Sequence, residues 1–150
     1  MTTPTDFAGP QGDLLLRTMP MPADTNYIGD IFGGWIMSQM DLAGSLLANE
    51  VARSRVVTVA VESMQFIKPV RVGDVVCCHG RVKRVGTTSV TIMLEVWVQP
   101  ILQAGTDRCT IFKVTEAAFT YVAIGEDGKK RPIDKTLLRP VCAPCAGSAR

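Results

Sequence analysis

An acidic residue inside an apolar helical segment is the feature of this sequence best suited to chemistry. The segment spans residues 33–52, where apolar side chains recur at spacings of 4, 3, 4 and 4, namely Ile36, Met40, Ala43, Leu47 and Val51. Asp41 lies at the margin of the narrow polar arc of that helix, and most of the remaining surface is apolar. A carboxylate is rarely buried unless it is paired, hydrogen-bonded or functional. Asp41 is therefore either a functional carboxylate or a structural acceptor for a neighbouring loop.

Glycines mark two further positions on the same helix. Gly33 and Gly34 open it, where free backbone N–H groups and the positive end of the helix dipole suit a phosphate or a developing oxyanion. A glycine pair also ends loops for purely steric reasons. Gly34 precedes Asp41 by seven residues, which is about 10 Å along the axis. Gly44, beside Asp41, leaves room for another chain or a ligand to approach closely.

A third candidate is the group of basic residues around a tight turn, consisting of Lys68, Arg71, Arg81, Lys83 and Arg84. Strand periodicity predicts that Arg81 and Lys83 share a face and that Arg84 points the other way. A ligand phosphate could use them together with the turn Gly86, Thr87, Thr88 and Ser89. Solvated positions on a strand face are the alternative, and for single residues the commoner one.

Other nucleophilic or metal-binding arrangements have little support. His79 is the sole histidine, and a strand would place Cys77 on its face in a geometry that suits a packed side chain better than a catalytic pair. Cys142 and Cys145 have CxxC spacing in a Pro/Ala/Gly-rich segment without a second pair, so spare thiols are the favoured interpretation. We expect no metal site, because no ligand cluster, Walker loop or dinucleotide fingerprint occurs.

Composition limits the class of protein. The chain has 150 residues, 47% of them hydrophobic, and 16 basic against 14 acidic residues. The length and hydrophobic content fit one globular domain. The nearly balanced charge gives no strong positive electrostatic potential that would attract nucleic acid or anionic membranes, so neither partner is expected. No signal peptide or bilayer-spanning run is evident, and the five cysteines are odd in number. We therefore expect a soluble, cytoplasmic protein with reduced thiols.

The elements that must position these residues follow from periodicity. The expected order is a strand at 13–19, the helix at 33–52, and strands at 56–68, 75–85, 90–98 and 109–124. Residues 90–98 alternate strictly, as in a half-buried antiparallel strand. The expected domain covers 13–131, between a loose arm (1–12) and a poorly ordered tail (132–150). The pattern predicts an α+β fold in which one long helix, apolar on both flanks, covers a curved sheet, with a second copy nearby.

Several stretches resemble the hot-dog-fold acyl-CoA thioesterases, and most closely their YciA-like branch. The most specific reads GDIFGGWIMSQMD at residues 29–41, preceded by DTN at 24–26. Further matching stretches are RVVTVAV at 55–61, PVRVGDVVCC at 69–78, GTTS at 86–89, EVWV at 95–98 and TEA at 115–117. The resemblance covers about residues 14–131 and implies a central helix wrapped by an antiparallel sheet of about five strands.

The resemblance also implies roles for individual residues. Asp41 becomes the residue that drives hydrolysis, as general base or nucleophile, and Gly33 and Gly34 polarise the thioester carbonyl. Asn26 matches a position at the family's site and orients water or substrate. The CoA phosphates are assigned to Arg71, Lys83 and Arg84, with the turn at 86–89 meeting the pantetheine or nucleotide end.

Family members pair into dimers and often into hexamers, with sites between subunits. We therefore expect a homodimer as the smallest unit, assembled as a trimer of dimers, with acyl-CoA as substrate and no cofactor. A non-catalytic acyl-CoA sensor of the same fold is the main alternative. A hot-dog dehydratase would need a histidine in the loop before the helix, and this loop has none. A purely structural oligomer would not explain Asp41 beside Gly44.

Overall fold

The computed structural model describes residues 8–101 and 110–138. It contains one long helix, α1 (Gly33–Ala52), and two short 3₁₀ turns, η1 (Pro22–Asp24) and η2 (Lys135–Leu137). The strands are β1 (Asp13–Thr18), β2 (Arg55–Phe66), β3 (Asp74–Val85), β4 (Ser89–Pro100) and β5 (Phe112–Ile124). None of the helices in these ranges is long and apolar enough to cross a bilayer.

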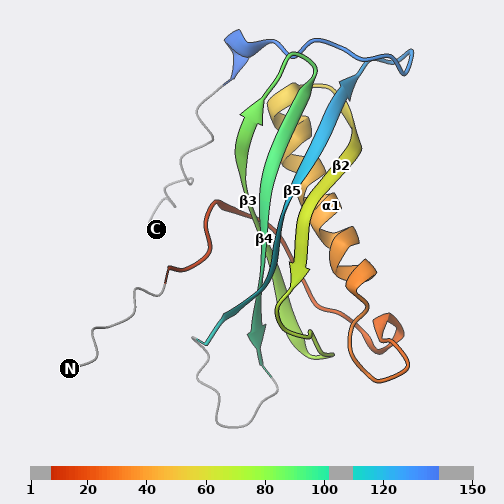
Figure 1. The fold of residues 1–150 in the computed structure, drawn as a ribbon, viewed down its shortest axis with the longest axis vertical. Coiled ribbons are helices and arrows are strands. Elements are labelled where there is room, and N and C mark those ends of the chain that lie inside the picture. The colour runs from red at the N-terminus through yellow and green to blue at the C-terminus, as the bar shows by residue number, and fades with distance from the viewer. Residues whose placement is uncertain (1–7, 102–109, 139–150) are drawn as a thin grey trace, which may run out of the picture.

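The five strands form one antiparallel sheet in the order β1-β3-β4-β5-β2. Helix α1 runs along one face of this sheet, as Figure 1 shows. The alternation of β4 supplies the core beneath the helix, because Val90, Ile92, Leu94, Val96 and Val98 are all at most 1% exposed. The predicted hot-dog architecture, with one helix and five strands, is confirmed.

Helix α1 begins and ends where the sequence predicts. Its apolar stripe faces the sheet, and Ile36, Met40 and Leu47 are buried. The helix ends at Arg53, whose left-handed backbone (φ 50°) stops the helical hydrogen-bond pattern. Leu42 and Leu46, on the apolar flank where we expect a second copy, remain about half exposed within one chain, at 49% and 52%.

Three expected boundaries move by a few residues. Strand β2 ends at Phe66 rather than at 68, β4 runs on to Pro100, and β5 begins at Phe112. Within the segment expected as a tail, Ile133 is only 7% exposed, and its amide donates to the Thr87 carbonyl (2.8 Å). That contact fastens the segment after β5 to the sheet. Cys142 and Cys145 lie outside the described residues.

The outer face of the sheet, opposite α1, carries a buried carboxylate. Glu95 is 5% exposed and accepts hydrogen bonds from the Trp97 indole (2.8 Å) and the Gln11 amide (3.2 Å). Lys113 lies 3.5 Å from Glu95 and also pairs with Glu116. Burial raises the pKa of Glu95, but these hydrogen bonds and the Lys113 charge together lower that pKa below its ordinary 4.5. The ionised carboxylate thus fixes the arm before β1 to the sheet.

Acidification should remove this stabilisation. A carboxyl whose pKa is lowered by folding stabilises the protein above its unfolded value of 4.5, and the contribution is lost as the pH falls below it. We expect Glu95→Gln to be less stable than the wild type near neutral pH, and the difference to shrink below about pH 4.5. Urea unfolding across this range measures it, with the exposed Glu126→Gln as control. A difference that does not change with pH would contradict the assignment.

Candidate active site

Asp41 projects from the middle of α1 toward the inner face of β2 and β5. The Thr58 hydroxyl of β2 donates to Asp41 Oδ1 at 2.6 Å. The Tyr121 hydroxyl of β5 lies 3.2 Å from the same Oδ1 and 3.0 Å from the Asp41 backbone carbonyl oxygen. Two hydroxyls therefore converge on one carboxylate oxygen.

This convergence is a consequence of strand register. Thr58 and Tyr121 are direct partners across β2 and β5, and such partners project on the same face of an antiparallel pair. Tyr121 is fully buried, at 0% exposure. Burial, the Asp41 charge and the hydrogen bond to Asp41 together raise the pKa of Tyr121 far above its ordinary value of 10. The phenol consequently stays protonated, and remains a donor, throughout the neutral range.

Gly44 makes room for Tyr121, which corrects the expectation that a ligand or another chain approaches there. A Cβ at position 44 would lie 2.3 Å from the Tyr121 hydroxyl and 2.9 Å from Leu94 Cδ1. Only glycine allows the phenol to reach the helix backbone at this point. The small residue beside Asp41 therefore serves a contact within the chain.

The N-terminal tip of α1 lies apart from Asp41. Phe32 caps the helix without a side-chain hydrogen bond, and a Cβ at Gly34 would meet nothing within 4 Å. Gly33 is closer to the sheet, because a Cβ there would touch the Phe66 ring at 3.3 Å. Within one chain the tip and Asp41 are about 10 Å apart along the axis, so one subunit does not bring them together.

A cavity of about 350 Å³ opens beside this tip. Its lining is largely apolar, with Asp30 and Lys68 as its charged members. The apolar residues of the lining are Ile31, Ile36, Phe66, Ile67, Pro69, Val70 and Val114. A volume near 350 Å³ falls within the range of small-molecule sites, which is roughly 300–1,000 Å³.

Asn26 shapes the loop before α1. Its side-chain oxygen accepts hydrogen bonds from the amides of Ile28 and Asp30, both at 3.0 Å. Asn and Asp side chains commonly close turns in this way. The side-chain oxygen of Asn26 thus already accepts hydrogen bonds within the loop. Its NH₂ group is the part that can donate a hydrogen bond to a water or a substrate.

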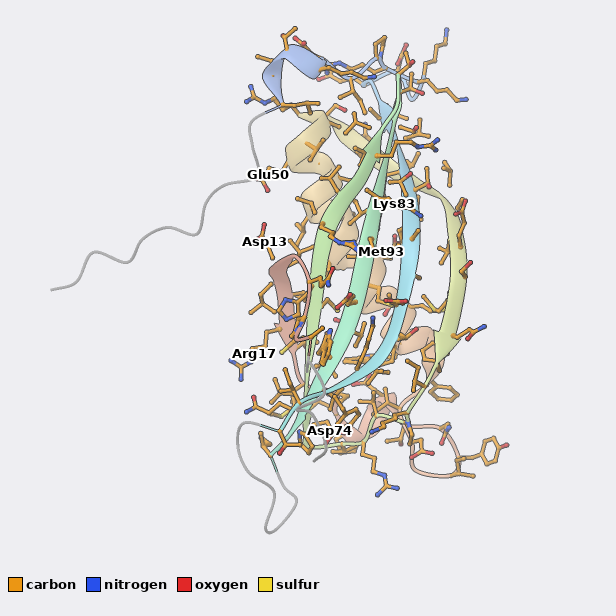
Figure 2. All side chains as sticks on the ribbon, turned by 60° about the vertical axis from the view of Figure 1, so that its left-hand side comes forward. Asp13, Arg17, Glu50, Asp74, Lys83 and Met93 are labelled. Carbon is orange, nitrogen blue, oxygen red and sulfur yellow. The ribbon has the colours of Figure 1, made fainter. Side chains whose placement is uncertain are left out.

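The predicted CoA-binding residues do not form one cluster within a chain. Arg71 lies near the tip, 3.9 Å from Asp30, and its amide donates to Asp74 at the start of β3. Lys83 and Arg84 lie near the other end of this strand, and Figure 2 shows Asp74 and Lys83 toward opposite ends of the molecule. Arg71 and Arg84 are separated by the length of β3, roughly 35 Å at 3.3 Å per residue.

A bulge in β3 changes the direction of Arg84. The register shifts between Val82 and Arg84, so that Arg84 pairs with Thr91 while Arg81 pairs with Met93. Thr91 and Met93 share the outer face, and Arg84 therefore lies on the same face as Arg81, contrary to the prediction from simple alternation.

The tight turn at 86–89 closes on itself through the Gly86 amide and the Ser89 carbonyl (2.7 Å). The carbonyls of Thr87 and Thr88 accept from Ile133 and Ala123, both at 2.8 Å. The backbone of this turn therefore anchors the segments around the end of β5.

His79 lies on the outer face, opposite Glu95, and its Nδ1 is 3.4 Å from the Gly12 carbonyl oxygen. This places the imidazole on the side of the sheet away from Asp41. Within 8–101 and 110–138, no three His, Cys, Asp or Glu side chains are grouped as metal ligands.

Thr58 and Tyr121 were not predicted as site residues from the sequence. They lie 17 and 80 residues from Asp41, and each stands inside a run of ordinary strand formers. Local spacing carries no signal for either contact, since both depend on how β2 registers against β5.

Comparison with known proteins identifies the family. The Thioesterase superfamily matches residues 28–104. The acyl-CoA thioester hydrolase YciA of Salmonella typhimurium is 57% identical over 124 residues, covering 83% of this chain and 92% of that protein. The chain belongs to the Thioesterase superfamily. The corresponding Escherichia coli protein, also named acyl-CoA thioester hydrolase YciA, is equally similar, with 57% identity and the same coverage.

Solved thioesterase structures share the fold. The hexameric thioesterase y2039 from Yersinia pestis is 53% identical with a TM-score of 0.77, covering 83% of this chain and 98% of that one. The hexameric hotdog fold thioesterase Cj0915 of Campylobacter jejuni is 42% identical with a TM-score of 0.78, covering 83% and 92%. The resemblance to hot-dog thioesterases drawn from residues 24–41 is thereby confirmed.

Two glycines of α1 give a matched test of the Tyr121 contact. Gly44→Ala should destabilise the protein by about 1–3 kcal/mol, because the added methyl group overlaps the buried phenol. Gly34→Ala places its methyl group in open space and should leave stability unchanged or slightly higher. The free energy of unfolding from urea titration measures both. Equal effects of the two variants would show that Tyr121 does not need the space at Gly44.

Proposed function

We propose that this protein is an acyl-CoA thioesterase that hydrolyses acyl-CoA to CoA and a carboxylic acid, with Asp41 as the reacting carboxylate. The observation that carries the proposal is the state of Asp41, whose Oδ1 is held by two hydroxyls while no hydrogen bond of the described residues occupies Oδ2. Membership of the Thioesterase superfamily and the names of the relatives at 57% identity support this reaction.

Asp41 can act in two ways. As a general base it takes a proton from water, whose oxygen attacks the thioester carbonyl, and the C–S bond then breaks to release CoA as a thiolate. As a nucleophile its Oδ2 attacks the carbonyl, CoA leaves, and water hydrolyses the resulting mixed anhydride. Both routes consume one water and one thioester, so we expect no cofactor to be required.

The amide of Gly34 is the proposed donor to the thioester oxygen. An uncapped helix N-terminus stabilises negative charge that develops on a carbonyl oxygen. Because this amide is about 10 Å from Asp41 within a chain, the reacting carbonyl must meet the Gly34 amide of another subunit. We therefore place each site between two copies of the chain.

The exposed edge of β2 indicates how two copies meet. Among the described strands, β2 pairs only with β5, and Val57, Val59 and Val61 on it are 41%, 56% and 38% exposed. An unpaired strand edge that carries apolar side chains favours pairing with another strand. A second β2 running antiparallel would extend the sheet and leave both helices on one face.

The register of that pairing follows from contacts along β2. Asp41 bonds to Thr58, whereas Gly33 lies against Phe66. If the two-fold axis passes near Glu62, midway between these positions, Thr58 faces Phe66 of the partner subunit. The helix tip of the partner subunit then lies beside Asp41. This arrangement removes the separation found within one chain.

The same pairing brings the proposed CoA-binding residues of the two chains together at each end of the dimer. Antiparallel copies place Arg71 of one chain at the same end as Lys83 and Arg84 of the partner subunit. We assign these cations, with the turn at 86–89, to the CoA phosphates and the adjoining pantetheine or nucleotide. The NH₂ group of Asn26 is assigned to the water or substrate, and Gly33 to substrate contact at the tip.

The cavity beside the tip is the proposed site of the acyl chain. Its apolar lining suits an alkyl group, and the cavity begins at Gly33, next to the proposed donor Gly34. Solved relatives are described as hexameric thioesterases. We propose a trimer of these dimers for this protein as well.

Asp41→Asn tests the proposed function. The amide neither accepts a proton from water nor attacks the carbonyl effectively, so turnover should fall by at least about 10²-fold while the variant stays folded. Release of free CoA from a series of acyl-CoA esters measures this, with detection that excludes the protein's own thiols. The exposed Asp127→Asn serves as a matched control and should retain wild-type rates.

Two outcomes would contradict the proposal. If Asp41→Asn hydrolyses acyl-CoA at the wild-type rate, another group carries the reaction. If the wild-type oligomer binds acyl-CoA esters and hydrolyses none of them, the protein is a sensor rather than an enzyme.

A further inference from the structure

We propose that Tyr121 is a positioning residue that fixes Oδ1 of Asp41 and so leaves Oδ2 as the oxygen that reacts. This inference rests on the proposed function, because it takes Asp41 as the reacting carboxylate. Tyr121 itself does not contact the substrate in this account. Its hydroxyl acts through the orientation of the carboxylate.

The first support is the geometry of the carboxylate. Tyr121 and Thr58 approach the same oxygen, at 3.2 and 2.6 Å, and the phenol also lies 3.0 Å from the Asp41 carbonyl oxygen. One hydroxyl thus spans the backbone and the side chain of a single residue. Such a contact restricts rotation of the Asp41 side chain relative to the helix.

The second support is the rigidity of the donor. Tyr121 is fully buried, and its ring stacks with Phe119 at 6.4 Å between centroids and 19° between planes. Gly44 lies directly against the phenol hydroxyl, because a Cβ at this position would be only 2.3 Å from it. Thr58, by contrast, is exposed within one chain and lies on β2, the last strand of that chain's sheet. Of the two hydroxyl donors to Asp41, Tyr121 is therefore the more rigidly held.

The third support is the electrostatic environment. Among the ion pairs of residues 8–101 and 110–138 none involves Asp41, so neutral hydroxyl donors stabilise its charge. His79 lies on the other face of the sheet. Hydrogen bonds to a charged group are stronger than those between neutral groups, so removing one donor should have a measurable effect.

Tyr121→Phe tests the proposal, since it removes the hydroxyl and keeps the ring. We expect kcat for acyl-CoA hydrolysis to fall about tenfold with KM within about twofold, because the substrate-binding surface is untouched.

Thr120→Val is the matched control. Thr120 neighbours Tyr121 on β5 but bonds to Thr91 (3.1 Å) on the outer face, so the variant loses one hydroxyl without touching Asp41. It should keep the wild-type kcat and KM. Urea unfolding and the oligomeric state of each variant show whether it is folded.

A second variant covers the case in which Tyr121→Phe does not fold. Gly44→Ala retains the phenol but displaces it from Asp41, and should give the same loss of kcat with KM little changed. Wild-type kinetics in either folded variant would overturn the positioning role. If these variants have wild-type kinetics and Asp41→Asn is inactive, only the positioning role of Tyr121 fails and the proposed function stands. If Asp41→Asn is active, the proposed function fails as well.

Discussion

The arrangement of this site depends on one close approach between helix and sheet, at Gly44. The absence of a side chain there lets the Tyr121 phenol reach the backbone of α1, where it bonds to Asp41. Thr58 completes the contact from the neighbouring strand. The position of the helix along the sheet and the orientation of the carboxylate are therefore set by the same few atoms.

Elements with a strong period could be predicted from the sequence. The helix at 33–52 and the alternating strand around 90–98 follow from their apolar repeats, and the order of elements gives the antiparallel sheet. Boundaries were less predictable, since Pro100 still belongs to β4 and Ile133 packs beyond the expected end of the domain. Both depend on contacts between distant segments.

The candidate site could be predicted only in part. Asp41 stands out because a carboxylate is unusual in an apolar helix, but nothing local indicates that Tyr121 and Thr58 hold it. Those contacts arise from the register of β2 against β5. Arg84 was misplaced for a related reason, because a bulge cannot be read from alternation. The carbonyl oxygen of Asn26 was likewise already used by its own loop.

A carboxylate in the middle of a helix and a donor at its tip cannot reach one carbonyl within a single chain. The separation of about 10 Å along α1 makes this a geometric constraint rather than a matter of side-chain choice. The unpaired edge of β2 offers the means to satisfy it. Antiparallel pairing of two such edges would generate two equivalent sites, each with its carboxylate from one chain and its donor from the other.

The most direct test of shared sites is a mixing experiment with two variants that we expect to be inactive alone, Asp41→Asn and Gly34→Pro. Gly34→Pro removes the tip amide near the helix start, where proline is best tolerated. If sites are shared, each mixed dimer contains one intact site, and random reassociation should restore about a quarter of wild-type CoA release. If hydrolysis remains at the level of the separate variants although mixed dimers have formed, the carboxylate and the donor do not act across subunits.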